Sequence, residues 1–387
     1  MSEGDGGAGR ASVTDPALGR EVARDSRGAA AGLIPAVTPL HPPPARFEGG
    51  LTEVGPGIHA WLQPNGQLGE TNAGLVIGGG ASLLVDTLWD PRLTRRMLAA
   101  MAPLTAEAPI EAVVNTHSDG DHWWGNQEVA GAEIVATDAA AAVMAQESPA
   151  DMKHFGRLAG ALRLAGSMPL PYPRRGEVAA IAAYMSEALA PFAFDEVRLV
   201  PPTRTFSGKL EIDVGGREVR LIEVGPAHTP GDLIVWVPDA RIAIAADILF
   251  IGVTPIMWAG PLAGWVAALE QLLDLGAERF VPGHGPVCGP DEVRRLIDYW
   301  RWLERAAGER LEAGRAPAAT ARELVLGDEI AERGFADWLG PERAQVSVGT
   351  IDAHRRGVAK PPGPRQLIAA FSRMALLARD LNGREHT

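Results

Sequence analysis

The sequence predicts an α/β protein whose sheet is mixed rather than purely parallel. From about residue 46 onward, short apolar runs of strand length alternate with segments of helical period. Several runs follow one another through tight turns, which join antiparallel strands, whereas parallel strands need a longer crossover. Apolar residues make up 46% of the 387-residue chain and charged residues 22%, as in globular proteins with a substantial core.

The elements of the first half follow from local sequence patterns. Residues 1–45 are rich in Gly, Ala and Pro, and we expect a flexible N-terminal arm without a core of its own. Apolar runs and turn residues then predict strands at 57–63, 72–78, 82–87, 110–116 and 131–137, with a helix at 90–101. The Ala- and Met-rich segment 138–195 has helical spacing, and we interpret it as a helical insertion that covers a site.

The second half repeats the alternation and then becomes helical. We expect strands at 197–206, 209–216, 218–224, 233–239 and 241–247, a helix at 264–276, and a strand and loop at 278–285. A catalytic domain at 46–290 is thus followed by a helical C-terminal extension at 291–387. Apolar residues of the last helix can pack on the domain or on another subunit, which leaves a homo- or hetero-oligomer open; they are Leu367, Ile368, Phe371 and Met374.

Composition limits the classes of partner. The net charge of -12 argues against nucleic acid, because phosphate binding needs a basic face. Residues 248–269 carry no charge, but Gly and Pro interrupt them, so a buried strand, a loop and a helix start explain them better than a membrane span. Cys288 is the single cysteine, so no intrachain disulfide is possible, and we expect it to be small and buried. We therefore expect a cytoplasmic protein with a small-molecule substrate, no membrane and no nucleic acid.

The segment His117-Ser-Asp-Gly-Asp-His122 holds four potential metal ligands within six positions. It lies where a predicted strand ends and a helix begins. A turn of this kind points alternate side chains into one cavity. Two cations could therefore share the segment.

Three further candidates lie at the ends of other predicted strands. His228 begins a His-Thr-Pro-Gly segment, Asp247 ends the strand 241–247, and His284 lies within Pro-Gly-His-Gly-Pro. The C-terminal ends of strands are the edge where open α/β sheets bind ligands. A single histidine after a strand is often a packing residue. Four of nine histidines in such places indicate a shared site.

This series of motifs resembles the metallo-β-lactamase superfamily over residues of about 50 to 290. The resemblance implies an αββα sandwich with mixed sheets and a metal-dependent enzyme. Carried over position by position, it implies one metal site from His117, Asp119 and His228. A second site uses Asp121, His122 and His284, and Asp247 bridges both.

The first motif departs from the family pattern at Asp119, where the usual form His-x-His-x-Asp-His has a histidine. Aspartate is shorter than histidine, so it either binds a metal through a water or leaves the first site weak. Alternatively it ligates the metal directly, and its hard oxygen donor then shifts the preference of that site toward harder metal ions. We expect two Zn²⁺ per chain, with Fe or Mn as alternatives because of Asp119. A di-iron oxidase is the corresponding alternative function, since related di-iron proteins carry a glutamate at this place.

The expected reaction is hydrolysis by a metal-bound hydroxide, with Asp121 and Asp247 as catalytic carboxylates that orient the water. The bond is an ester, thioester, lactone, ether or related bond of a small substrate, with an aromatic substrate as one candidate. A non-hydrolytic alternative is a Lewis-acid enzyme, because the form through Gly125-Asn126 is similar to members associated with polyketide ring closure. A third alternative is a degenerate binding protein that has lost its metals.

Aromatic residues near these motifs are candidates for substrate binding. Trp123 and Trp124 follow the first motif, and Trp258 follows the Asp247 strand. They either pack in the core or form an aromatic wall for an apolar substrate. His154 lies in the expected insertion and is a further candidate.

Overall fold

The computed structural model describes residues 49–64, 68–148, 150, 157, 160–161, 174–360 and 363–383. The predicted N-terminal arm, and the part of the predicted insertion that contains His154, lie outside these residues.

The first sheet has seven strands in chain order: β1 (Gly50–Gly55), β2 (Ile58–Leu62), β3 (Ala73–Ile77), β4 (Ser82–Val85), β5 (Ile110–Val114), β6 (Glu133–Thr137) and β7 (Arg204–Phe206). Strands β1 to β4 pair antiparallel, with short turns between β1 and β2 and between β3 and β4, and β4 to β7 pair parallel. The crossover between β4 and β5 is helix α1 (Pro91–Thr105), whose N-cap Asp90 accepts hydrogen bonds from the backbone N–H groups of Arg92 and Leu93.

The second sheet has five strands in the order β12, β11, β10, β9, β8. Their bounds are β8 (Lys209–Val214), β9 (Arg217–Glu223), β10 (Leu233–Val237), β11 (Ile242–Phe250) and β12 (Arg279–His284). Antiparallel pairing joins β8 through β11, while β11 and β12 pair parallel across helix α5 (Leu262–Asp274). Both sheets are therefore mixed, as the sequence predicts.

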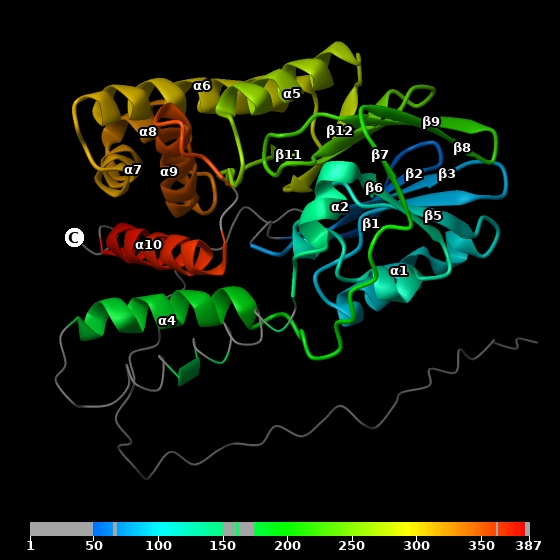
Figure 1. Ribbon diagram of the computed structural model, residues 1–387. Helices are drawn as coiled ribbons and strands as arrows, with labels where there is room; N and C mark the ends of the chain where they lie inside the picture. Colours follow the sequence, from blue (N-terminus) through cyan, green and yellow to red (C-terminus); the bar gives the residue numbers. More distant parts are fainter. Residues whose placement is uncertain are drawn as a thin grey trace, which may run out of the picture. The chain divides into compact units, whose positions relative to one another are not determined.

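The two sheets stack face to face between helical layers (Figure 1). Alternate residues of both sheets share one apolar core, for example Ile58 and Val85 from the first sheet and Leu221 and Ile244 from the second. Met97 and Met101 of α1 cover the outer face of the first sheet. Helices α5 and α6 (Pro290–Glu312) cover the outer face of the second. The predicted αββα sandwich is confirmed.

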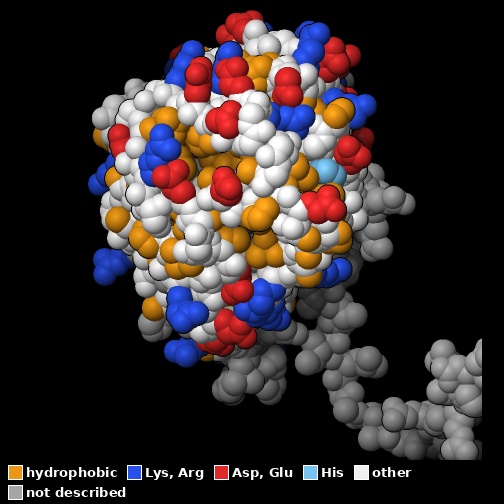
Figure 2. All heavy atoms as spheres, turned by 90° about the vertical axis from the view of Figure 1, so that its right-hand side faces the viewer, with side chains coloured by type: hydrophobic (Ala, Val, Ile, Leu, Met, Phe, Trp, Pro, Cys, Tyr) orange, Lys and Arg blue, Asp and Glu red, His pale blue; other side chains and the backbone are white. Residues whose placement is uncertain are grey.

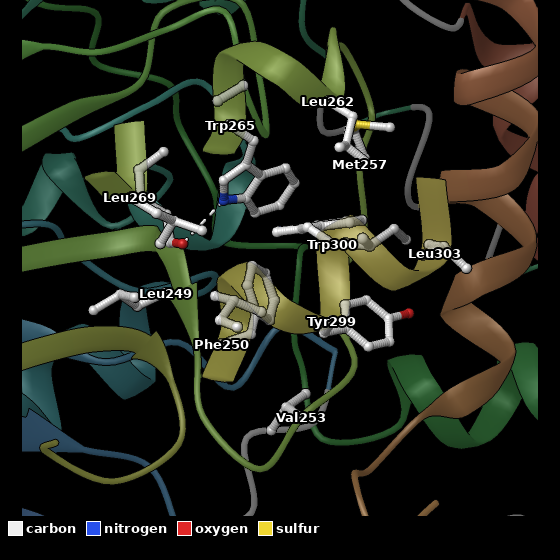
Figure 3. Close-up of a cluster of buried hydrophobic side chains, with 14 of the residues drawn as sticks. Leu249, Phe250, Val253, Met257, Leu262, Trp265, Leu269, Tyr299, Trp300 and Leu303 are labelled. Atoms are coloured by element: carbon white, nitrogen blue, oxygen red, sulfur yellow. Dashed lines mark hydrogen bonds between the residues drawn. The ribbon is translucent and has the colours of Figure 1, made fainter. Parts of the chain in front are cut away.

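A cluster of large side chains lies between the second sheet and these helices (Figure 3). Phe250 of β11 packs near Trp265 of α5, and Trp265 lies beside Trp300 of α6 with ring centroids 4.7 Å apart. The indole N–H of Trp265 donates to the carbonyl oxygen of Ile248 at 3.0 Å. The cluster thus fixes the strand that carries Asp247.

The C-terminal region is helical, with α6 followed by α7 (Pro317–Leu326), α8 (Asp328–Glu332), α9 (Ala344–Arg355) and α10 (Pro364–Asn382). Helix α10 contacts α7, α9 and α4 (Arg175–Leu189). Its Met374 is fully buried, whereas 38% of Ile368 is exposed. The apolar face expected on this helix therefore packs largely against other helices of the same chain.

Three local expectations need correction or completion. The predicted strand 197–206 shrinks to β7, because Pro201 and Pro202 remove two of its backbone donors. Strand β11 does not end at Asp247 but continues to Phe250. Strand β1, which the sequence patterns missed, pairs with β2 at the edge of the first sheet.

The uncharged run 248–269 divides into the end of β11, a loop and the start of α5, as expected. Among the described residues, no helix has the length and apolar character that a membrane crossing requires. One face of the molecule carries acidic and basic side chains interspersed among hydrophobic ones (Figure 2). Opposite charges are thus mixed on this face rather than gathered in separate patches.

Candidate metal centre

The candidate ligands come from loops and strand ends of both sheets. His117 follows β5, and the short helix η1 (Gly120–His122) carries Asp121 and His122. His228 lies in the loop after β9, and His284 is the last residue of β12. Asp247 lies inside β11, where the pairing with β12 is irregular. The fold brings together all seven positions that the sequence singled out.

Four imidazoles surround the Asp247 carboxylate, and each lies closest through Nε2. Oδ2 of Asp247 is 3.4 Å from His228, 3.4 Å from His284 and 4.0 Å from His117. Oδ1 is 3.2 Å from Nε2 of His122. All five side chains are at least 95% buried. Asp247 therefore occupies the position of a bridging group.

The remaining carboxylates complete two groups of ligand atoms. His117, Asp119 and His228 form one group, and Asp121, His122 and His284 form another. Oδ2 of Asp119 is 3.1 Å from Nε2 of His228, so the shorter side chain does reach the first group. His117, His122 and Asp247 form a third group that joins the two.

The donor set fits metal ions. Nε2 of His117 is buried and has no hydrogen-bond partner among the described residues. A buried polar atom without a partner is costly unless a ligand satisfies it. Imidazole nitrogens and carboxylate oxygens are the ligands that zinc and other divalent transition metals accept.

Three of the candidate histidines have a hydrogen-bond partner at Nδ1, the ring nitrogen that is farther from Asp247, and none of these partners is a candidate ligand. Nδ1 of His122 lies 2.8 Å from Oδ2 of Asp86, and Nδ1 of His228 lies 2.7 Å from the carbonyl oxygen of Ile256. Nδ1 of His117 lies 3.1 Å from the hydroxyl of Thr116. Acceptors at Nδ1 place the proton there and leave Nε2 to face a metal.

Asp86 is a residue of the candidate site that sequence reasoning missed, because it contacts a candidate ligand directly. It is buried in the loop after β4, and its backbone adopts φ of 63°. Its carboxylate also accepts hydrogen bonds from the backbone N–H and the hydroxyl of Thr116, both at 2.7 Å. The available signal was an aspartate at the end of the apolar strand 82–87.

The ionisation of the imidazoles follows their surroundings. Burial lowers the pKa of His117, and the neighbouring His122 adds to this, so the ring is neutral as a ligand must be. Burial acts the same way on His228, but the hydrogen bond and the charge of Asp119 outweigh it and raise its pKa to about 9. Asp247 and Asp86 likewise raise the pKa of His122. A metal therefore displaces protons when it binds these two rings.

Tight backbone geometry brings Asp247 into the site. A Cβ atom on Gly283 would lie 1.7 Å from Oδ1 of Asp247, so no larger residue fits there. Ala246 adopts φ of 44°, which is unusual for a residue with a side chain. The ring of His284 stacks on Phe250 at 5.0 Å between centroids, and Trp265 packs edge-on against His228. Phe250 and Trp265 belong to the apolar cluster in Figure 3, so this cluster packs against both ligands.

The predicted substrate residues have different positions. Trp123 and Trp124 are buried in a core cluster with Trp89 and Phe194, which favours the packing interpretation for these two rings. Trp258 is partly exposed, and its backbone N–H donates to the carbonyl oxygen of His228. His154 lies outside the described residues.

Glu147, which the sequence analysis did not single out, lies beside Trp124 and close enough to Asp119 and Asp121 to be affected by their charges. Its carboxylate accepts a hydrogen bond from the indole N–H of Trp124 at 2.7 Å. Burial raises its pKa to about 8, and the charges of Asp119 and Asp121 act in the same direction. No local motif marks this glutamate, because it follows a short Ala-rich helix, α2 (Asp138–Met144).

An αββα sandwich with a buried His/Asp cluster at the strand ends defines a class of metal-dependent proteins. A sequence model of the metallo-beta-lactamase superfamily matches residues 66–284, more than half of the chain. The chain belongs to the metallo-beta-lactamase superfamily, and the predicted family is confirmed. Membership points to an enzyme that binds metal ions.

Two curated proteins are similar to parts of the chain. It is 25% identical over 249 residues to the 2,4-dinitroanisole O-demethylase subunit alpha of Nocardioides sp. strain JS1661, covering 62% of this chain and 60% of that protein. It is 31% identical over 88 residues to the Beta-lactamase-like protein 2 homolog of Caenorhabditis elegans, covering 23% of this chain and 28% of that protein. The chain thus matches less than two thirds of either relative.

A solved structure shares the fold over a longer stretch. The sec-alkylsulfatase Pisa1 from Pseudomonas sp. aligns with a TM-score of 0.54 at 17% identity, covering 81% of this chain and 52% of that chain. The alignment is longer than the segment matched by the family model, so the likeness in fold is not limited to that segment.

Proposed function

We propose that this protein is a metal-dependent hydrolase with two metal ions per chain, most simply Zn²⁺, that cleaves an ether or ester bond of a small aromatic substrate. The observation that carries the proposal is the arrangement of four imidazole Nε2 atoms around the Asp247 carboxylate. His117, Asp119 and His228 would hold one ion, Asp121, His122 and His284 the other, and Asp247 would lie between them.

The ions, when bound, supply a water of lowered pKa and a positive charge that polarises the bond to be broken. The chain's own residues then set geometry and exclude competing water. Burial of the four histidines keeps the cluster in a low-dielectric environment, where charge interactions are strong. Asp119 is partly open, with 32% of its side chain exposed, whereas the four histidines and Asp247 are buried, so a substrate would enter from the side of the partly exposed carboxylates.

The ether alternative is supported by the relative that is named as an O-demethylase subunit. Its named substrate, 2,4-dinitroanisole, is an aryl methyl ether. Hydrolysis of such a bond adds one water and gives a phenol and methanol, so no oxidant is consumed. We therefore rank an aryl ether first, with an aryl ester as the second class.

Metal analysis and a labelled hydrolysis assay test the proposal. We expect about two metal ions per chain by mass spectrometry, and release of a phenol from 2,4-dinitroanisole or 4-nitrophenyl acetate without oxygen or a reductant. In ¹⁸O-labelled water, the label must enter a product. An intact chain with no bound metal, or product formation that requires oxygen, would refute the hydrolase.

We also propose that the chain assembles with a further subunit, either a second copy or another protein. The relative's description as a subunit supports this, as does the exposure of Ile368 on α10. Light scattering of the purified chain tests it. A monomer at all concentrations would exclude the homo-oligomer, and co-purification of a partner chain would support the hetero-oligomer.

A further inference from the structure

A cavity of about 410 Å³ lies among α7, α9 and α10, and we call it the C-terminal cavity. Its apolar wall includes Trp258, Pro317 and Val346. None of the seven candidate metal ligands lines it. The volume lies within the range of small-molecule sites.

Positive charge surrounds the C-terminal cavity, although the chain as a whole is acidic. Arg356, Lys360 and Arg373 line it together with a single carboxylate, Asp352. Asp352 is already paired with Arg356 at 2.6 Å. Within the described part of the chain, neither Lys360 nor Arg373 forms an ion pair. The cavity therefore has a surplus of positive charge at exposed side chains and an apolar interior.

We propose that the C-terminal cavity binds a small organic anion whose apolar body packs against Trp258 and whose acidic group meets Lys360 and Arg373. A carboxylate suits this arrangement because it accepts hydrogen bonds from both cations. Burial of the apolar body supplies most of the affinity, while the cations select for charge. This site is separate from the proposed metal chemistry and does not depend on it.

The C-terminal cavity is nevertheless linked by hydrogen bonds to the segment that carries His228. Trp258 and Ala259, which both line the C-terminal cavity, donate their backbone N–H groups to the carbonyl oxygen of His228 at 3.1 and 3.0 Å. Thr350, another lining residue, donates its hydroxyl to the carbonyl oxygen of Met257 at 2.8 Å. The anion thus binds against the segment that holds one candidate ligand.

Calorimetric titration with 2-naphthoate, and with the neutral 2-naphthamide as a matched probe, tests the proposal on the full chain. We expect naphthoate to bind more tightly than naphthamide. Lys360→Met and Arg373→Met should each weaken naphthoate by about two- to fivefold, because exposed charges are partly screened, and leave naphthamide unchanged. Lys209→Met is the matched control, since this exposed lysine lies on β8 outside the cavity.

A second variant tests the location directly. Gly349 lines the C-terminal cavity on α9, and a Cβ atom there would meet nothing within 4 Å. Gly349→Leu should therefore fold normally, fill the space and abolish binding of both probes. Naphthoate binding should persist after a chelator removes the metals. Equal affinity for both probes, unchanged binding in Gly349→Leu, or loss of binding on metal removal would each overturn the proposal.

Discussion

Asp86→Asn tests whether a carboxylate outside the ligand set fixes the protonation of His122. In the native protein Oδ1 of Asp86 accepts from the Thr116 backbone N–H at 2.7 Å, and Oδ2 lies 2.8 Å from Nδ1 of His122. An asparagine must keep its carbonyl oxygen toward the Thr116 N–H. In the reverse orientation its NH₂ group would face that N–H, and two hydrogen-bond donors would oppose each other. Its NH₂ group then faces Nδ1 of His122.

The consequence is a change of tautomer at His122. An amide N–H at this place needs an acceptor, so Nδ1 loses its proton and Nε2 carries it instead. Nε2 is the atom that lies 3.2 Å from Asp247 in the ligand cluster. In the native protein a metal displaces the Nε2 proton and the ring keeps the proton on Nδ1, which Asp86 accepts. In the variant, metal binding at Nε2 would leave a proton on Nδ1 that opposes the amide N–H, or would require the ring to lose both protons. We expect metal affinity to fall by about 10- to 100-fold, the range for lost support of a ligating histidine.

The fold itself should tolerate Asp86→Asn. Asparagine accepts the positive φ of 63° at this position, and the backbone N–H of Thr116 keeps its acceptor. The Thr116 hydroxyl, which donates to Oδ2 in the native protein, loses that acceptor and must turn to accept from the new NH₂ group. We expect the free energy of unfolding of the metal-free protein to change by less than about 1–3 kcal/mol, the cost of one unsatisfied buried group.

Competition with a chelator, followed by metal analysis, measures the effect. Asp90→Asn is the matched control, because Asp90 is equally buried but caps α1, where asparagine caps as well as aspartate. The control should hold metal like the native protein. A competition curve for Asp86→Asn that overlays the native one would refute the tautomer argument.

Three further substitutions follow from the geometry of the site. Gly283→Ala should displace Asp247 and lower the metal content, since the added Cβ would lie 1.7 Å from its Oδ1; full metal content would contradict this. Asp119→Ala should lose about one of two ions by mass spectrometry, because Asp119 contacts His228; unchanged stoichiometry would show that it is no ligand. Burial raises the pKa of Glu147 to about 8, so the stability of the metal-free protein should fall as the pH rises from about 5 to 8. Glu147→Gln removes this titration, and its melting temperature should rise relative to the native protein over the same range; a constant difference would contradict the shift.

The ligand set could be predicted because several of its members lie at the C-terminal ends of strands, where α/β sheets bind their ligands. His117 follows β5 of the first sheet and His284 ends β12 of the second; within each sheet, parallel strands bring their C-terminal ends to one edge. Asp247 lies near the same edge of the second sheet as His284, although its strand continues three residues further. The uncharged run after Asp247 was expected to begin with a strand, but the sequence did not indicate that this strand is the same one. The two parts join through an irregular pairing at Ala246, whose φ of 44° no side-chain pattern encodes.

The supporting residues could not be predicted, because their contacts join distant parts of the chain. Asp86 meets His122 across 36 positions, and Glu147 meets Trp124 across 23. A single aspartate after a strand or a glutamate after a helix is common. The C-terminal cavity is equally hidden, because it depends on how α7, α9 and α10 pack and not on the period of any one helix.

The substitution at Asp119 changes the charge of the site as well as its shape. Asp119, Asp121 and Asp247 give the cluster three carboxylates, whereas a histidine at position 119 would leave two. The additional negative charge would hold divalent cations more firmly and would also reduce the positive charge that they present to a substrate. A site of this kind is less effective at stabilising a poor leaving group. It suits a substrate whose departing oxygen is already stabilised, as in a nitrated phenol, and this is the class that the proposed aryl ether substrate supplies.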